Sequence, residues 1–299
     1  MQVTVKNLPK SQVQLNVVVP NNNVKSTYNA VVDQIVEETE LDGFRKGKAP
    51  KDKVLAKTDK GKLYGEVVNQ LLEKYYPQAV KEKLIQPISN PKVEIKEFDI
   101  EKDFEFDATL ATKPEVNIGD YKKALKEAYD NKVKEAKAQN AEKLKKGEEI
   151  SSEQHIHLSQ AEIVEAILNV SNVEIADILV EQETERMLSR LVDQLGQIGL
   201  TLEKYLEAQT KTAEQLRKEY EDAAETTIKG EFVLGTMVVK ENVNVSEEDL
   251  VEALKASGVE NAVERLKEPT EKWYIKSILE KNNLLTKLAQ EVEGHSHDE

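Results

Sequence analysis

The chain has 299 residues, of which 39% are hydrophobic and 5% aromatic, and it carries a net charge of −14 and no cysteine. The lack of cysteine excludes a disulfide framework, a cysteine-ligated zinc site and a thiol nucleophile. The mean hydropathy is −0.58, and no stretch approaches the ~20 apolar residues of a membrane-spanning helix, which excludes such a membrane span. The N-terminal MQVTVKNLPK has no basic segment followed by an apolar one, so we expect a cytoplasmic protein of about two domains.

The negative charge is confined to the second part of the chain. Residues 1–113 contain 18 basic and 17 acidic side chains, a net of +1, whereas residues 114–299 contain 24 and 39, a net of −15. Within the first part, residues 42–62 hold eight basic and three acidic side chains, a local charge of +5. Clustered positive charge is suited to a phosphate-rich partner. A solvated lysine-rich surface, however, has the same composition.

The first part of the chain alternates between strand and helix patterns. Residues 12–19 place apolar side chains at every second position, which predicts a half-buried strand. From Tyr28 the apolar residues recur at i, i+3 and i+4, which predicts an amphipathic helix, and a second, longer helix is predicted from about 63 to 84. Alternation returns weakly over 93–95 and clearly over 104–110. This order predicts an α+β domain with an antiparallel sheet that helices cover on one face.

Past Pro114 the strand patterns fade, and we expect the rest of the chain to be all-helical. Residues 120–147 are rich in Ala, Lys and Glu and predict a helical arm of roughly 42 Å, with a break at 147–154. A further helix is predicted from about Ile175 to Leu195. Capping residues mark the starts of other helices at Ser159, Thr201, Thr212 and Ser246.

Three further expectations concern the end of the chain. Residues 232–239 are apolar all round, so we expect this segment to be buried on several sides. Pro269 and Thr270 begin what we expect to be a last pair of helices. The terminal GHSHDE has the composition of a disordered tail.

One loop carries residues suited to recognition: Leu41-Asp-Gly-Phe-Arg-Lys-Gly-Lys-Ala-Pro50, between the two helices of the first part. Its glycines, proline and basic residues predict a tight, exposed turn. Because Gly43, Arg45 and Lys46 cannot bury Phe44, we expect an exposed ring that anchors a partner while the cations reach phosphate or carboxylate. The loop is not a Walker A motif, since only three residues separate its glycines and Ala49 follows Lys48.

The segment GFRKGKAP (43–50) resembles the ribosome-docking signature of the trigger factor family, the bacterial chaperones that meet nascent chains at the ribosomal tunnel exit. The second part resembles the helical body of that family, notably over Asn172–Glu183 and the run through Val239. The similarity covers residues 1–113 and 170–292. It implies that Phe44, Arg45 and Lys46 contact a ribosomal protein and adjacent RNA and that Gly43 and Gly47 shape the loop. We also count Lys48 and Pro50 among the ribosome-binding residues of this loop.

The resemblance implies an ATP-independent chaperone that docks on the ribosome, holds nascent or unfolded polypeptides, needs no cofactor, and forms a homodimer when off the ribosome. We expect a ribosome-binding domain at 1–113, a linker and long helical arm at 114–158, a helical body at 159–292 and a disordered tail at 293–299. Weak, multiple contacts would let a client leave without a nucleotide cycle.

One feature of the family is missing from the sequence. Typical members carry a prolyl isomerase domain of the FK-binding type, a β-sheet fold of ~100 residues. The one candidate segment here, 114–165, has 52 residues and no strand pattern. We therefore expect no isomerase activity. Two alternatives remain: an isomerase with a reduced domain, and a holdase that no longer uses ribosomes.

Other chemistry-bearing motifs are weak. His155 and His157 form an H-x-H pair that would bind metal only with further ligands, and His295 and His297 lie in the tail. We expect a polar loop at the first pair and no metal site. The sequence contains no G-x-S-x-G, H-E-x-x-H or G-x-G-x-x-G motif, and we predict no catalytic residues.

Overall fold

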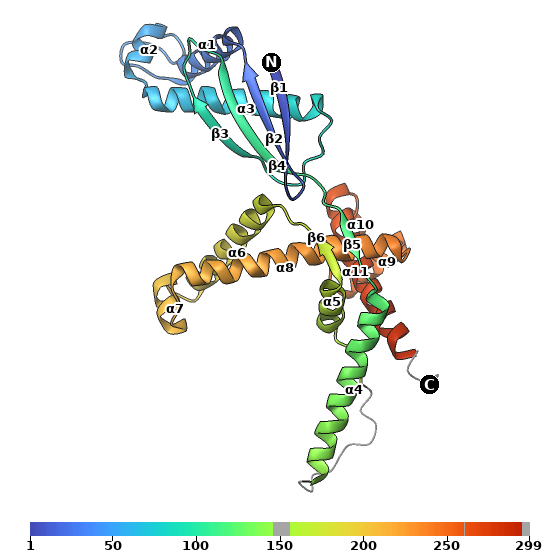
Figure 1. Cartoon of the computed structure of the whole chain (residues 1–299). Helices are drawn as coiled ribbons and strands as arrows, with labels where there is room; N and C mark the ends of the chain where they lie inside the picture. Colours follow the sequence, from blue (N-terminus) through green and yellow to red (C-terminus); the bar gives the residue numbers. More distant parts are fainter. Residues whose placement is uncertain (146–155, 260, 295–299) are drawn as a thin grey trace. The chain divides into compact units, whose positions relative to one another are not determined.

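The structure is a computed structural model that describes residues 1–145, 156–259 and 261–294 (Figure 1). The chain forms two compact units. The N-terminal unit consists of Met1–Pro114 together with Ala176–Gln182, and the C-terminal unit consists of Glu115–Ile175 and Glu183–Glu299. Each unit is described by itself below.

A four-stranded antiparallel sheet forms the centre of the N-terminal unit. Its order is β1 (Gln2–Leu8), β2 (Gln12–Val19), β4 (Phe104–Ala111) and β3 (Lys92–Glu97). The three strands predicted from alternation are confirmed, whereas β1 was not predicted. It is an edge strand in which Val3 is buried and Val5 is exposed, so its apolar pattern is weak.

Three helices accompany the sheet: α1 (Asn21–Glu38), α2 (Lys51–Lys57) and α3 (Lys60–Glu82). α1 begins seven residues earlier than predicted, directly after Pro20. The backbone N–H of Asn21 donates to Asp103 Oδ1 over 2.8 Å, and its side-chain amide donates to the carbonyl of Ile100 over 2.7 Å. Hydrogen-bond partners that are distant in sequence thus satisfy backbone groups of the first helical turn, which has no apolar periodicity of its own.

The core of this unit lies between one face of the sheet and the helices. Leu15 and Val17 of β2 and Phe104 and Phe106 of β4 are fully buried. They share a cluster with residues of α1 and α3, including Val24, Val31, Val67, Leu71 and Ala79. The opposite face is polar: the side-chain amide of Asn16 donates to Glu105 and Asp107 over 2.7 and 2.8 Å. The predicted sheet with helices on one face is therefore confirmed.

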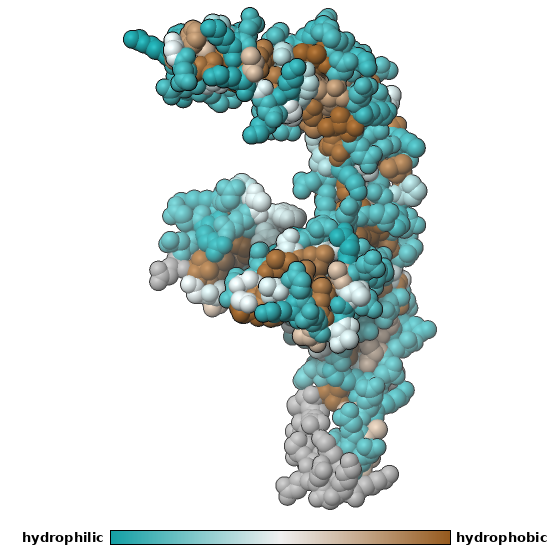
Figure 2. Space-filling model, turned by 90° about the vertical axis from the view of Figure 1, so that its left-hand side faces the viewer, coloured by the Kyte–Doolittle hydropathy of each residue, from teal (hydrophilic) through white to brown (hydrophobic). Residues whose placement is uncertain are grey.

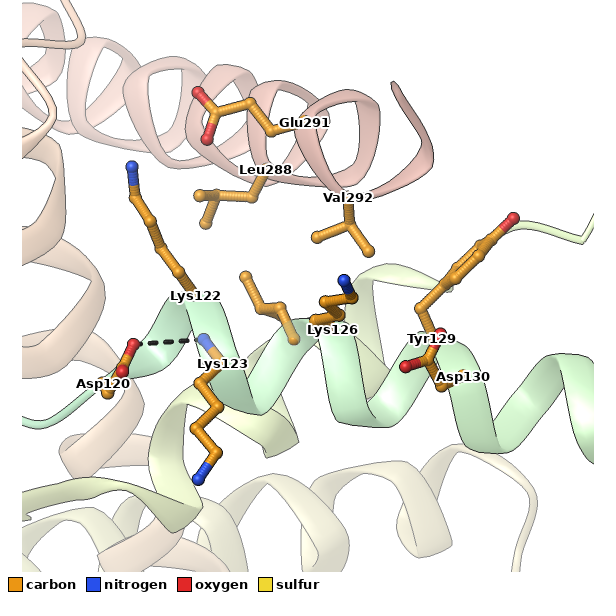
Figure 3. Close-up of a pocket in the computed structure, with 10 residues that line it drawn as sticks. Asp120, Lys122, Lys123, Lys126, Tyr129, Asp130, Leu288, Glu291 and Val292 are labelled. Carbon is orange, nitrogen blue, oxygen red and sulfur yellow. Dashed lines mark hydrogen bonds between the residues drawn. The ribbon is translucent and has the colours of Figure 1, made fainter. Parts of the chain in front are cut away.

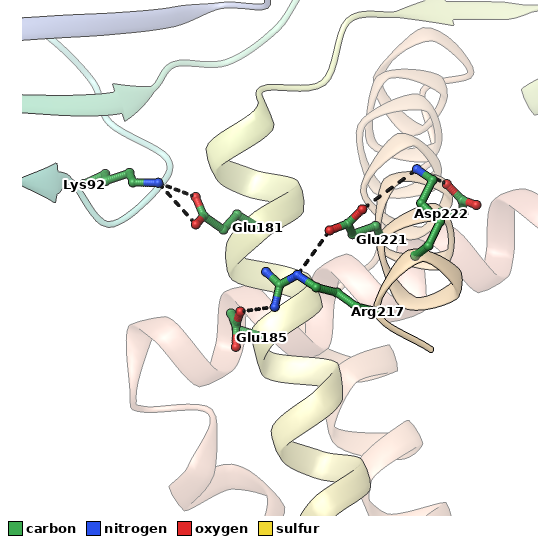
Figure 4. A network of polar contacts seen from close by, with 7 residues as sticks. Lys92, Glu181, Glu185, Arg217, Glu221 and Asp222 are labelled. Carbon is green, nitrogen blue, oxygen red and sulfur yellow. Dashed lines mark hydrogen bonds and ion pairs between the residues drawn. The ribbon is translucent and has the colours of Figure 1, made fainter. Parts of the chain in front are cut away.

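A short later segment, Ala176–Gln182, belongs to the same unit. Ala176 and Ile178 are buried with Ala111 at the end of β4. Glu181 forms an ion pair with Lys92 at 3.0 Å (Figure 4). The sequence patterns did not indicate this return of the chain, because seven residues are too few to show a periodicity.

The C-terminal unit is mostly helical, as expected, but it also contains a short two-stranded sheet that the sequence did not predict. β5 (Val116–Ile118) pairs antiparallel with β6 (Ser171–Val173). Three-residue strands are too short for an alternation to be recognised. The backbone N–H of Gly119 donates to the carbonyl of Val170 over 2.9 Å, and a Cβ at position 119 would lie only 2.6 Å from that oxygen. The two strands therefore approach so closely that only glycine fits beside them.

After β5, the described part of the chain contains β6 and eight helices, the third of which begins in the N-terminal unit: α4 (Tyr121–Lys145), α5 (Gln160–Asn169), α6 (Asp177–Gln197), α7 (Leu202–Gln209), α8 (Ala213–Lys240), α9 (Glu247–Ala256), α10 (Ala262–Arg265) and α11 (Pro269–Gly294). The predicted caps are confirmed. Ser159, Thr212 and Ser246 form capping boxes, and Thr201 accepts from the Lys204 N–H. α11 is one long helix and not the expected pair.

The core of the C-terminal unit joins the start of α4 to α5, α8 and α11. Its largest members are fully buried, namely Leu125, Ile163, Ile167, Met237, Leu284 and Leu288. From Asp130 to Glu142 the side chains of α4 are exposed or half-buried, as its sparse apolar pattern suggests. The expected break at 147–154 and the tail from His295 lie outside the described residues, while Glu293 and Gly294 belong to α11.

The apolar segment 232–239 differs from expectation. Val233 and Met237 are fully buried, yet Val239 is 76% exposed. α8 therefore has an apolar side chain on its solvent side near its end, and this position takes part in the surfaces described next.

Candidate functional site

The predicted recognition loop lies between α1 and α2. Two successive turns build it: the Phe44 N–H donates to the Leu41 carbonyl and the Lys48 N–H to the Arg45 carbonyl, each over 2.9 Å. Gly43 and Gly47 adopt φ values of +85° and +75°, which L side chains rarely adopt. A Cβ at Gly47 would also lie 3.3 Å from the carbonyl oxygen of Glu37 in α1.

A small apolar cluster holds the ends of the loop. Leu41 and Ala49, on either side of the turns, are buried together with Val54 of α2. Ile35 and Val36 at the end of α1 pack against the same cluster. The loop is therefore attached at both ends to helices, and its middle projects from a fixed base.

Phe44 is not the freely exposed ring that its neighbours in sequence suggest. It is half-buried against the cluster of Leu41, Ala49 and Val54. The ammonium group of Lys53 lies 5.0 Å from the centre of its ring. Local sequence gave the wrong expectation because the residues that cover the ring come from the two ends of the loop and from α2. One part of the ring stays accessible.

The cations of the loop face solvent. Arg45, Lys46 and Lys48 are exposed, and none of their side chains pairs with an acidic group within the described residues. In contrast, Lys51 at the start of α2 forms an ion pair with Asp33. Three uncompensated cations beside an accessible aromatic ring suit a partner that presents phosphate or carboxylate groups.

A second candidate surface consists of exposed apolar side chains of the C-terminal unit. The space-filling view shows hydrophobic patches interrupting a mainly hydrophilic surface (Figure 2). Periodicity could not identify these residues, since exposed and core positions share the same helical spacing. The large apolar side chains exposed in this unit include Val192, Ile198, Val239, Val263, Trp273, Tyr274 and Ile278.

A hollow of about 480 Å³ lies between α4 and α11 (Figure 3). Leu125, Leu288 and Val292 give it an apolar floor. Its edge carries three lysines and three acidic side chains, so the charges balance: Lys122, Lys123, Lys126, Asp120, Asp130 and Glu291. The oxygen of Asp120 is engaged, because it accepts the Lys123 N–H over 3.1 Å. The hollow therefore offers apolar contact to a ligand without favouring a positively or a negatively charged one.

A half-buried polar cluster fixes α4 to the helices beneath it. The Tyr121 hydroxyl donates to Glu241, and the Lys287 ammonium donates to the same carboxylate over 2.8 Å. Burial raises the pKa of Tyr121, and the contact with Glu241 raises it further. The hydrogen bond from Lys287, followed by that from Tyr121, lowers the pKa of Glu241. Tyr121, Glu241 and Lys287 are thus hydrogen-bonded to one another, which gives the cluster a structural role.

Surface charges elsewhere form ordinary ion pairs. In the C-terminal unit, Arg217 pairs with Glu185 at 2.8 Å and with Glu221 at 3.3 Å, and Lys218 pairs with Asp222 at 2.9 Å (Figure 4). These side chains are largely exposed, so each pair contributes little to stability.

The histidines do not form a metal centre in the part of the chain that is described. His157 Nδ1 lies 2.7 Å from Glu293 Oε1. His155, His295 and His297 fall outside the described residues. Among the residues with a described position, no three His, Asp or Glu side chains are placed to hold a metal ion. Likewise, no described helix has the length and apolar character needed to cross a membrane.

Known proteins are similar to this chain over nearly its whole length. A family model described as "Bacterial trigger factor protein (TF)" matches residues 1–146, and one described as "Bacterial trigger factor protein (TF) C-terminus" matches residues 119–292. The trigger factor of Streptomyces avermitilis is 25% identical over 378 residues, covering 85% of this chain and 82% of the relative. That of Staphylococcus carnosus is 22% identical over 371 residues, covering 81% and 84%.

The alignments with both relatives are longer than this chain, so both relatives contain stretches without a counterpart here. A solved structure from work on "Promiscuous Substrate Recognition in Folding and Assembly Activities of the Trigger Factor Chaperone" superposes with a TM-score of 0.63. It covers 98% of this chain and 100% of that chain at 15% sequence identity. This similarity establishes the shared fold.

Proposed function

The chain belongs to the bacterial trigger factor family, and on that premise we propose that it is an ATP-independent chaperone that docks beside the ribosomal tunnel exit and holds nascent polypeptides. Docking is assigned to the loop at 43–50, and the holding of clients to the C-terminal unit.

The geometry of the loop is the observation that carries the docking proposal. Arg45, Lys46 and Lys48 project from turns that two glycines with positive φ make possible. Cations presented in this way neutralise RNA phosphates and release counterions, which gives affinity that falls as salt rises. The accessible part of Phe44 adds an apolar contact to a ribosomal protein. The apolar base of the loop supplies the rigidity that such recognition needs.

The distribution of charge supports a single point of attachment. Residues 1–113 carry a net charge of +1 and residues 114–299 a net charge of −15. Like charges repel, so an acidic helical part keeps away from ribosomal RNA while the basic loop approaches it. The docking loop is then the favoured contact with RNA.

Holding of clients requires exposed apolar side chains whose contacts are individually weak. The C-terminal unit supplies them at separate positions, among them Ile198 and Trp273. An unfolded segment that touches several such positions is retained, and it leaves when folding buries its own apolar residues. Release by this route requires no nucleotide.

Co-sedimentation with ribosomes tests the docking assignment. We compare the wild type with Phe44→Ala/Arg45→Ala/Lys46→Ala and with a control, Lys6→Ala/Lys81→Ala, that removes two exposed cations of the same unit outside the loop. The triple variant is expected to remain in the supernatant and the control to pellet with ribosomes. If the triple variant pellets as the wild type does, the docking assignment is wrong.

The same variants test whether docking and client binding are located on different surfaces. The triple variant should still suppress aggregation of an unfolded client in free solution, because its changes lie outside the C-terminal unit. Light scattering of a chemically unfolded protein on dilution measures this directly. Loss of suppression in the triple variant would assign client binding to the loop instead.

A further inference from the structure

We propose that the hollow beside Trp273, between α8 and α11, is a pocket for one bulky, uncharged side chain of an unfolded polypeptide, with a preference for aromatic rings. The inference rests on the proposed chaperone function and names the kind of segment that this part of the surface takes.

The hollow has a volume of about 280 Å³, and its wall includes Gly235, Val239, Trp273, Lys276, Glu280 and Lys281. Val239 and Trp273 are 76% and 69% exposed. Exposed large apolar side chains on both sides of one hollow favour an apolar occupant, because contact removes apolar surface of both partners from water.

The size of the hollow selects the kind of occupant. Pockets for drug-sized ligands span ~300–1,000 Å³, so this one is at or below the lower limit. A helix, with a diameter of ~10–12 Å including its side chains, is too wide to enter. A single large side chain presented by an extended segment is the occupant of matching size. An indole ring on the wall adds favourable stacking or edge contacts when that side chain is aromatic.

The charges around the hollow are compensated. Lys276 pairs with Glu280 at 3.6 Å, and Lys281 pairs with Glu231. The side chains of Glu280 and Lys281 are each only 17% exposed, so these charges are held close to the protein. The pocket therefore presents no net charge to an occupant. Binding here should be insensitive to salt, unlike binding by the loop at 43–50.

Glycine at position 235 helps to keep the hollow open. A Cβ built on Gly235 meets no atom within 4 Å, so a side chain at this position enters empty space that belongs to the hollow. Gly235→Leu is therefore expected to fill the pocket without a clash, and the helix tolerates it because leucine has a higher helix propensity than glycine. Gly196 in α6 offers a matched control, since its Cβ also meets no atom and it does not line the hollow.

Intrinsic fluorescence tests the proposal, because Trp273 is the single tryptophan of the chain. The full-length protein is titrated with a short, uncharged, tryptophan-free peptide that carries one phenylalanine among glycines and serines, and with the same peptide carrying alanine. We expect a saturable blue shift with the phenylalanine peptide, unchanged when salt is raised about tenfold, and no shift with the alanine peptide.

Gly235→Leu should weaken the binding of the phenylalanine peptide at least about tenfold, as expected for the loss of one buried aromatic contact, while Gly196→Leu binds as the wild type does. An unchanged emission in the wild type, or wild-type affinity in Gly235→Leu, overturns the proposal. Circular dichroism of each variant checks that the helices are retained.

The failure of this inference is distinguishable from failure of the proposed function. If the peptide does not bind while the wild type still suppresses client aggregation and pellets with ribosomes, the pocket is wrong and the chaperone assignment stands. If the peptide binds but aggregation is not suppressed, the pocket exists and the chaperone assignment is wrong.

Discussion

Replacing Gly47 by alanine should weaken docking more than the same change at Gly43. Both residues have positive φ, and a left-handed conformation costs a residue with a Cβ about 1–2 kcal/mol. At Gly43 this is the full penalty, because a Cβ there meets no atom within 4 Å. At Gly47 the Cβ would also lie 3.3 Å from the backbone oxygen of Glu37, so the end of α1 must shift to accommodate it.

The magnitude follows from the population of the native loop. A penalty of about 1–2 kcal/mol reduces that population roughly 5- to 30-fold when the loop can rearrange by itself. Gly43→Ala should therefore lower ribosome affinity by up to this factor, and Gly47→Ala by more. Urea denaturation should show only a small change in the midpoint for either variant if the loss is confined to the loop.

The assay is equilibrium binding of labelled protein to ribosomes, with Gly65→Ala as a control. Gly65 lies in α3 with no atom within 4 Å of its Cβ position and no positive φ, so alanine there should leave affinity unchanged. Equal affinity of Gly47→Ala and wild type would refute the reasoning, because the turn at 45–48 would then not be required for docking.

Three further predictions concern the rest of the chain. The hydrogen bonds from Lys132 and Ser159 lower the pKa of Glu162 to about 2, so the stability that they give is present above the ordinary pKa of 4.5 and is lost as pH falls from there toward 2. Urea denaturation at pH 7 and pH 3 should therefore show a smaller pH dependence of stability in Glu162→Gln than in the wild type. Equal pH dependence in the two proteins would contradict this. Gly119→Ala should destabilise the protein by about 2 kcal/mol or more, because its Cβ would lie 2.6 Å from the Val170 oxygen. Thermal unfolding measures this change. An unchanged midpoint would argue against the close approach of β5 and β6. Catalytic amounts of the protein should not accelerate proline-limited refolding of a model substrate, since α4 and α5 are separated by only residues 146–159, far fewer than the ~100 of an isomerase domain; acceleration would restore the isomerase alternative.

The parts of the fold that the sequence predicted are those stabilised by local, repeated patterns. The alternation at 12–19 and 104–110 marks strands with one buried face, and the capping residues Ser159 and Thr212 mark true helix starts. The features that were missed depend on distant partners. The first turn of α1 is satisfied by Asp103 and Ile100, and β5 is stabilised by pairing with a strand more than fifty residues later.

In the candidate site, too, the local features could be predicted from the sequence and those that depend on distant residues could not. The turn at 43–48 could be predicted, since glycine, proline and basic residues determine it locally. The burial of Phe44 could not, because it depends on Leu41, Ala49 and Val54 meeting beneath the ring. The exposure of Trp273 and Val239 could not be predicted from the sequence either, since core and surface positions of α8 and α11 share one periodicity. Which side of a helix is covered is decided by its packing partners.

The two proposed surfaces rely on different forces, and this difference bears on how a chaperone without a nucleotide cycle can work. Under the docking proposal, the loop at 43–50 binds through uncompensated cations, so its affinity should depend on the phosphate density of the partner and on salt. The pocket at Trp273 has paired charges and apolar walls, so its affinity depends on how much apolar surface the client still exposes. Folding of the client removes that surface without altering any phosphate contact. The two proposals together imply that a client can be released while the protein stays on the ribosome, because folding reduces the exposed apolar surface that the pocket binds and leaves the phosphate contacts of the loop unchanged.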